Sequence, residues 1–116
     1  MPDRTNIHFM DGDTVAANVY LHHGGTDVPD ILNEFFDEVI TNIPTDTRFD
    51  DPEYLAARFV VFMARKYSLR KHPLDFLGVG VMTRDASDVQ YIVTVQFYRD
   101  GIKPKITIKN VCEYND

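Results

Sequence analysis

Apolar side chains recur along the chain with two different periods, and the period changes near residue 73. Between residues 28 and 71 they recur every three or four positions, which is typical of helices that bury one face. Before and after that region they alternate with polar side chains, which is typical of half-buried strands. The pattern therefore predicts two strands, then two helices, then three strands.

Two segments carry the helical pattern, and each has start and stop signals. The first spans residues 28–43 behind Asp27 and ends before Pro44, and the second opens at Asp51 and Pro52 and ends before Pro73. An acidic residue suits the N-cap and a proline suits the first turn. The predicted buried stripes are Val28, Ile31, Leu32, Phe35, Phe36, Val39, Ile40 and Ile43 in the first helix, and Leu55, Phe59, Phe62, Met63 and Tyr67 in the second.

The strand segments predict a hairpin at the start of the chain and a meander at its end. Residues 5–10 and 14–22 flank Asp11-Gly12-Asp13, and a three-residue loop there would place Ile7 opposite Ala17. In the meander, a two-residue turn at Asp100-Gly101 would place Val95 opposite Ile106, Val93 opposite Ile108 and Val89 opposite Cys112. Both registers keep the apolar side chains on one face of the sheet.

These elements predict an α+β fold of order ββααβββ. We expect an antiparallel sheet of about five strands with two helices packed on one face. A chain of 116 residues is an ordinary size for one core, so residues 1–116 are expected to form a single domain.

Charge and composition limit the classes of function. Residues 1–53 carry 12 acidic and 2 basic side chains (2 − 12 = −10) and residues 54–116 carry 6 acidic and 10 basic ones (10 − 6 = +4), which gives the net charge of −6. Nucleic-acid binding would therefore need a local basic patch. The single cysteine cannot form an internal disulfide, which favours a reducing, cytoplasmic location, and no apolar run is long enough to span a membrane.

The richest local chemistry lies where the second strand leads into the first helix. Tyr20, His22 and His23 are followed by Gly24 and Gly25, and then by Asp27 at the start of the helix. Backbone N–H groups at a helix N-terminus can hold an anion. A plain strand-to-helix turn explains the glycines equally well, because glycine supplies the positive φ that a turn needs.

The histidines also allow a metal-site hypothesis. His8 and His22 are expected on one face of the hairpin, where His23 or an acid such as Asp11, Asp13 or Asp27 would complete a zinc or manganese site. The chain would then be a small metal-dependent hydrolase or nuclease-like enzyme. No established metal-binding spacing is present, so we expect no metal or other cofactor, and surface histidines without a ligand fit the same residues.

A basic group ends the second helix. Arg65, Lys66, Arg70 and Lys71 could meet a phosphate, a nucleic acid or an acidic protein. Alternatively, they complement the helix dipole beside acidic residues of the first helix. The separation of charge also permits a homo-oligomer, in which the acidic helix of one copy faces the basic end of another.

Two stretches resemble a family of small uncharacterised proteins of phages and prophages. Family members carry a Y-x-H-W-D-G-Y-P-like element before one helix and a D-P-E-Y-L-A-A-like opening of the next. The corresponding residues are Tyr20 to Gly25 and Asp51 to Ala57, with His23 in place of the tryptophan and Gly24 in place of the aspartate. The resemblance implies a small accessory protein that works by binding, and it carries no established activity.

The combined expectation is a non-enzymatic protein-interaction domain, possessing no membrane segment and related to phage accessory proteins. Its predicted binding residues are Tyr20, His22, His23, Gly24, Gly25, Asp27, Arg65, Lys66, Arg70 and Lys71. The alternatives left open are the metal-dependent enzyme at the histidines and a nucleic-acid-binding module at the basic end of the second helix.

Overall fold

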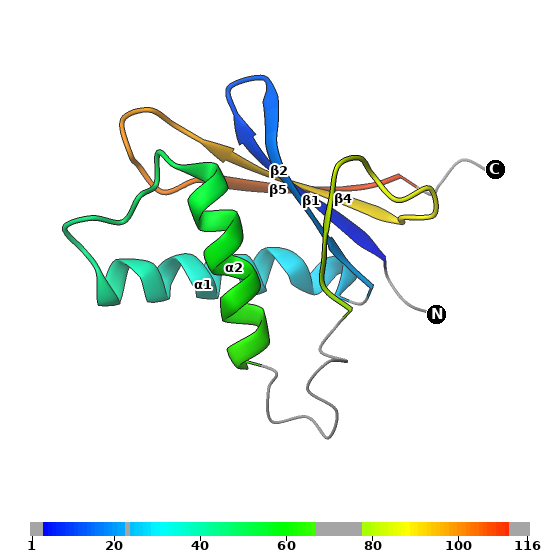
Figure 1. The fold of residues 1–116 in the computed structure, drawn as a ribbon, viewed down its shortest axis with the longest axis horizontal. Coiled ribbons are helices and arrows are strands. Elements are labelled where there is room, and N and C mark those ends of the chain that lie inside the picture. The colour runs from blue at the N-terminus through cyan, green and yellow to red at the C-terminus, as the bar shows by residue number, and fades with distance from the viewer. Residues whose placement is uncertain (1–3, 23, 67–77, 112–116) are drawn as a thin grey trace.

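The computed structural model describes residues 4–22, 24–66 and 78–111. They form an α+β fold in which a five-stranded sheet packs against two helices, as predicted (Figure 1). The elements are β1 (Thr5–Asp11), β2 (Thr14–Leu21), the short 3-10 helix η1 (Gly25–Asp27), α1 (Val28–Asn42), α2 (Pro52–Lys66), β3 (Gly80–Met82), β4 (Tyr91–Phe97) and β5 (Lys105–Asn110). The predicted order ββααβββ is confirmed.

The sheet is mixed, and its strand order is β3-β2-β1-β4-β5. Strand β1 runs parallel to β4, whereas the other three neighbouring pairs are antiparallel. The predicted all-antiparallel sheet and three-stranded meander are therefore wrong at one point: β3 pairs with β2, and the β4–β5 hairpin adds to the free side of β1. Local turn signals specify each hairpin, but they do not specify how separate hairpins join.

The register of the first hairpin differs from the predicted one by two residues. Ile7 pairs with Val19, rather than with Ala17, because the strands meet at a tight turn at Gly12-Asp13 and a bulge interrupts the ladder between Phe9 and Met10. A shift of two residues leaves the side chains from Thr5 to Phe9 and from Ala17 to Leu21 on their original faces. Beyond the bulge, Val15 pairs with Met10 and is 44% exposed. The predicted core face of the hairpin is therefore kept up to the bulge, although its pairing partners change.

The second hairpin has the predicted register. Val95 pairs with Ile106 and Val93 pairs with Ile108. The ladder stops at Gln96 and Lys105, so the connection is longer than the predicted two-residue turn. The predicted pair of Val89 with Cys112 lies outside the described residues, because the description ends at residue 111.

One hydrophobic core joins the sheet to both helices. The rings of Phe35, Phe36, Phe59 and Phe62 meet between the helices, with centroids 5.3 Å apart for Phe35 and Phe36 and 5.5 Å apart for Phe35 and Phe59. The strands contribute the alternate positions Ile7, Phe9, Val19, Leu21, Val93, Val95 and Phe97. Because these strand residues share one face, both helices cover that same face of the sheet.

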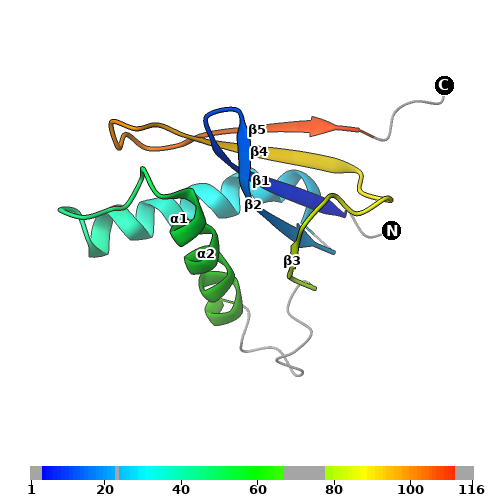
Figure 2. The same ribbon diagram turned by 45° about the horizontal axis from the view of Figure 1, so that its top comes forward.

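The apolar stripe of α1 extends beyond the part of the helix that packs in the core. Val28 to Phe36 are buried at the predicted positions, but Val39 is only partly buried, and Ile40 and Ile43 are 39% and 42% exposed. Figures 1 and 2 show the C-terminal part of α1 running past the strands, with α2 crossing it. The last turn of α1 therefore faces α2 and solvent, and not the sheet.

Among the described residues, no helix is both long enough and apolar enough to cross a bilayer.

Candidate functional site

The predicted histidine loop is held in place by contacts within the chain. The hydroxyl of Tyr20 lies 3.0 Å from Nδ1 of His22. On its other side, Cβ of His22 sits so close to Gly78 that a Cβ built there would come within 2.7 Å of it. Gly78 also has φ +56°, which favours glycine. His22 is thus a packed residue of this turn, and His23 lies outside the described residues.

The glycine pair makes the turn that starts the helical region. Gly24 has φ +133° and Gly25 has φ +49°, and the N–H of Asp27 donates to the carbonyl of Gly24 at 2.8 Å. A Cβ on Gly24 would also lie 3.0 Å from Val28, which is buried. Asp27 occupies the N-cap position of α1, as predicted, but its carboxylate makes no capping hydrogen bond. These features support the interpretation of the glycines as a turn.

The two described histidines of the metal hypothesis are not neighbours. His8 pairs with Asn18 across the hairpin, and His22 follows Asn18 by four residues. That spacing corresponds to roughly 13 Å along an extended strand, which is too far for ligands of one ion. Within residues 4–22, 24–66 and 78–111, no group of three or more histidine, cysteine, aspartate or glutamate side chains could hold a metal ion.

His8 instead belongs to a polar network on the face of the sheet opposite the helices. Its Nε2 atom lies 2.6 Å from Oδ1 of Asp85, and Nδ2 of Asn18 donates to the same oxygen at 2.8 Å. Asn6 donates to Asn18 at 2.5 Å and accepts the N–H of Ala86 at 3.0 Å. The network ties the segment before β4 to the two strands of the first hairpin.

The network also shifts the ionisation of Asp85. Partial burial raises the pKa of this carboxyl, but the hydrogen bonds from His8 and Asn18, together with the charge of His8, outweigh the burial. The pKa of Asp85 consequently lies below its ordinary value. The sequence alone does not reveal this cluster, because Asp85 is 77 residues from His8 and no local pattern connects them.

The basic end of α2 pairs with the acidic face of α1. Arg65 forms a hydrogen-bonded ion pair with Glu38, and Nζ of Lys66 lies 2.7 Å from a carboxylate oxygen of Glu34. A third cation, Lys103 of the β4–β5 connection, lies 3.1 Å from Asp37. The opposite charges of the two halves of the chain therefore meet within one molecule. Arg70 and Lys71 lie outside the described residues.

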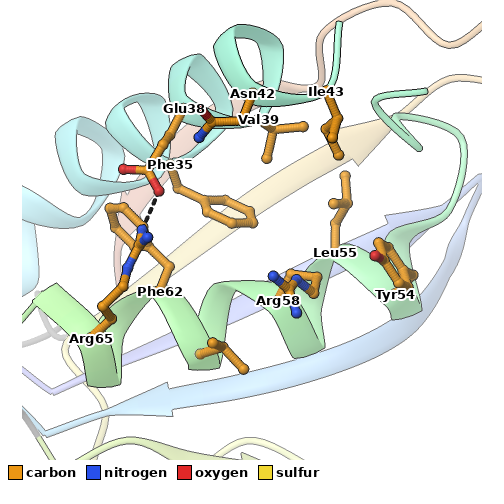
Figure 3. A pocket seen from close by; sticks show the side chains of 11 residues that line it. Phe35, Glu38, Val39, Asn42, Ile43, Tyr54, Leu55, Arg58, Phe62 and Arg65 are labelled. Carbon is orange, nitrogen blue, oxygen red and sulfur yellow. Dashed lines mark hydrogen bonds and ion pairs between the residues drawn. The ribbon is translucent and has the colours of Figure 1, made fainter. Parts of the chain in front are cut away.

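A groove opens between α1 and α2, where the two helices diverge (Figure 3). Its volume is about 370 Å³, which lies within the usual range for binding pockets. It is lined by Phe35, Glu38, Val39, Asn42, Ile43, Tyr54, Leu55, Arg58, Val61, Phe62 and Arg65. We call these residues the α1–α2 groove.

The groove has an apolar floor and one cation that has no acidic partner among the described residues. Phe35, Leu55 and Phe62 are buried beneath it, and Val61 is 51% exposed at its side. Arg58 is an exposed residue of α2 between Phe62 and Tyr54 (Figure 3), and within the described part of the chain it has no carboxylate partner. Arg65, by contrast, is bonded to Glu38 at one end of the groove.

The connection between the helices packs against residues of both helices beside the groove. Phe49 is buried against Phe36, with ring centroids 5.6 Å apart. Arg48, which has φ +60°, places its guanidinium 4.5 Å from the centroid of the Tyr54 ring. This cation–π contact holds Tyr54 where it lines the groove.

Sequence analysis did not identify this site, although part of the signal was present. Val61 lies outside the predicted buried stripe of α2, and Ile43 ends the stripe of α1. Val61 is thus an apolar residue in excess of what one helix face needs, whereas Ile43 belongs to the predicted stripe but is 42% exposed. Only the crossing of the helices brings the two to one groove.

Comparisons with protein-family models, with curated proteins and with solved structures found no match. The resemblance of two stretches to small phage proteins thus stays a prediction.

Proposed function

We propose that this chain is a non-enzymatic protein-interaction domain that binds a partner protein through the α1–α2 groove. The observation that carries the proposal is the gathering of exposed apolar side chains there: Ile43, Tyr54 and Val61 are 42%, 38% and 51% exposed and line the same groove. Exposed apolar surface that is contiguous, concave and rimmed by polar groups is typical of binding sites.

The proposal keeps the predicted class of function but changes the predicted surface. Tyr20 and His22 contact each other, Gly24 and Gly25 form a turn, and Arg65 and Lys66 pair with acids of α1. These residues have structural partners of their own, whereas Val61 and Arg58 present surface that the described residues leave uncovered. A phage-related role and a cytoplasmic location stay predictions.

The two alternative functions have less support. A metal-dependent enzyme would need ligands that converge, and His8 and His22 are separated along the hairpin. A nucleic-acid module would need free cations at the end of α2, where Arg65 and Lys66 already pair with Glu38 and Glu34.

A peptide selection tests the proposal. Random peptides displayed on yeast are selected on the wild-type protein after depletion on a Val61→Glu variant, which places a charge in the groove. We expect peptides whose affinity falls at least about tenfold, or about 1.4 kcal/mol, with Val61→Glu. The matched control is Val15→Glu, because Val15 is 44% exposed at the β1–β2 turn, away from the groove.

Two results would contradict the proposal. Either no peptide survives the depletion, or the surviving peptides lose as much affinity with the control Val15→Glu as with Val61→Glu. Far-ultraviolet circular dichroism and thermal unfolding of both variants establish that the folds are equivalent, which is expected because both valines are exposed.

A further inference from the structure

We infer that the occupant of the α1–α2 groove is an amphipathic helix of a partner protein, and that a carboxylate on this helix pairs with Arg58. The inference rests on the proposed function, since it requires that the groove binds a protein. It adds the secondary structure of the bound segment, its charge, and the residue that selects it.

The walls of the groove favour a helix over an extended segment. All the lining residues belong to α1, α2 or the residue that follows α1, and the backbone groups inside a helix already bond to one another. An extended segment would find no sheet edge here and would bury N–H and C=O groups without partners. A helix satisfies its own backbone and needs only apolar side chains three or four positions apart.

The charges of the groove favour an acidic residue on that helix. Arg65 is bonded to Glu38, so Arg58 is the lining cation that has no carboxylate partner among the described residues. Docking of an apolar surface would remove water from this guanidinium, and an unpaired charge loses much of its solvation when it is buried. A carboxylate opposite Arg58 would replace the lost water with a bidentate ion pair.

The same charges argue against a second copy of this chain. A two-fold axis through the groove would bring Arg58 close to its own symmetry mate, and like charges in contact are unfavourable. Three acids of α1 that lie in or beside the groove are already engaged within the chain. Glu34, Asp37 and Glu38 already pair with Lys66, Lys103 and Arg65.

A charge exchange between the protein and a groove-binding peptide tests the inference. Peptides from the selection are synthesised, and we expect them to share apolar residues at helical spacing and one Asp or Glu. Their helical circular dichroism should increase on binding. Two single changes should each weaken binding at least about tenfold: the acid of the peptide to Arg, and Arg58→Glu in the protein. Combining the two changes should restore most of the affinity.

The matched control for the charge is Arg99→Glu. Arg99 is an exposed residue of the β4–β5 connection and does not line the groove. This variant makes the same change in net charge as Arg58→Glu. We expect Arg99→Glu to bind the peptides with an affinity within about twofold of the wild type, because exposed charges that are far apart are screened by salt.

The outcomes separate the inference from the proposed function. If groove-dependent peptides bind without gaining helix, or if Arg58→Glu does not weaken them, the inference is overturned and the proposed function stands. If no groove-dependent peptide is found, both fail. Sedimentation of the wild type and Val61→Glu provides a further check, since a dimer that Val61→Glu dissociates would make the second copy the occupant and overturn the inference.

Discussion

Asp85 joins parts of the chain that are far apart in sequence. It bonds to His8 of β1 and to Asn18 of β2, and the N–H of the next residue, Ala86, donates to Asn6. A carboxylate oxygen that accepts two hydrogen bonds favours the ionised form. The side chain is 41% exposed, so solvent weakens this effect, but its direction is clear.

We therefore predict that Asp85 contributes to stability in a pH-dependent way. The pKa of Asp85 is lower in the folded protein than its ordinary value of 3.8, so the unfolded chain takes up its proton first as the pH falls. The free energy of unfolding of the wild type should exceed that of Asp85→Asn above about pH 5. The difference between the two free energies of unfolding should narrow as the pH falls below 3.8. Urea unfolding at several pH values measures it, and a gap that widens toward acid would contradict the prediction.

The two helices differ in how they begin, although the sequence predicts the same capping acid for both. Asp51 accepts the N–H of Tyr54 at 3.2 Å, and its carbonyl accepts the N–H of Leu55 at 3.1 Å. The carboxylate of Asp27 makes no such bond, because η1 runs directly into α1. Asp27 has helical backbone angles, φ −81° and ψ −15°, whereas a residue whose side chain caps a helix typically has β-region angles.

This difference predicts unequal effects of the same substitution. Asp51→Ala should lower the free energy of unfolding by about 1 kcal/mol, the usual cost of a lost N-cap. Asp27→Ala should cost clearly less, because no capping bond is removed. Urea unfolding of the two variants at neutral pH gives the comparison, and equal losses would show that the observed cap of α2 does not stabilise its helix.

At the scale of the whole molecule, one ring links three separate parts of the fold. Phe36 of α1 is fully buried and contacts Phe49 of the helix connection and Phe97 of β4, with centroids 5.6 and 6.2 Å away. Four residues later, Ile40 lies on the part of α1 that extends past the strands and is 39% exposed. The same helix therefore has one residue at the centre of the core and one outside it.

We predict that Phe36→Ala lowers the free energy of unfolding by about 3 to 5 kcal/mol, because it removes a buried ring and leaves a cavity. Ile40→Ala, on the same helix, should cost about 1 kcal/mol or less. Both are measured by urea unfolding monitored through helical circular dichroism. A similar loss of the free energy of unfolding in the two variants would contradict the placement of Phe36 inside the core and of Ile40 outside it.

Elements whose signals lie within a short segment could be predicted from the sequence. The limits of α1, the Asp51 cap of α2 and the pairing of Val95 with Ile106 all follow from periodicity, capping and turn chemistry over neighbouring residues. The bulge between Phe9 and Met10 could not, because both registers keep the apolar side chains on one face and the alternation does not distinguish them.

The candidate site was largely beyond the reach of the sequence. The sequence shows that Ile43 and Val61 are apolar, but the groove that they line exists only where the two helices cross. The histidines of the predicted loop and the cations at the basic end of α2 predict binding sites, because these side chains can bind many kinds of ligand. In the fold, His22 and Arg65 contact side chains of their own chain, namely Tyr20 and Glu38.

The sequence by itself determined the class of fold, the order of its elements and which face of each is apolar, because these depend on backbone geometry and on neighbours within a few positions. The tertiary structure alone decided that β4 lies parallel to β1, that Asp85 reaches His8, and that Arg58 lines an apolar groove between the two helices. Such contacts join residues far apart along the chain. Their choice depends on how complete surfaces fit together, and no local pattern encodes that fit.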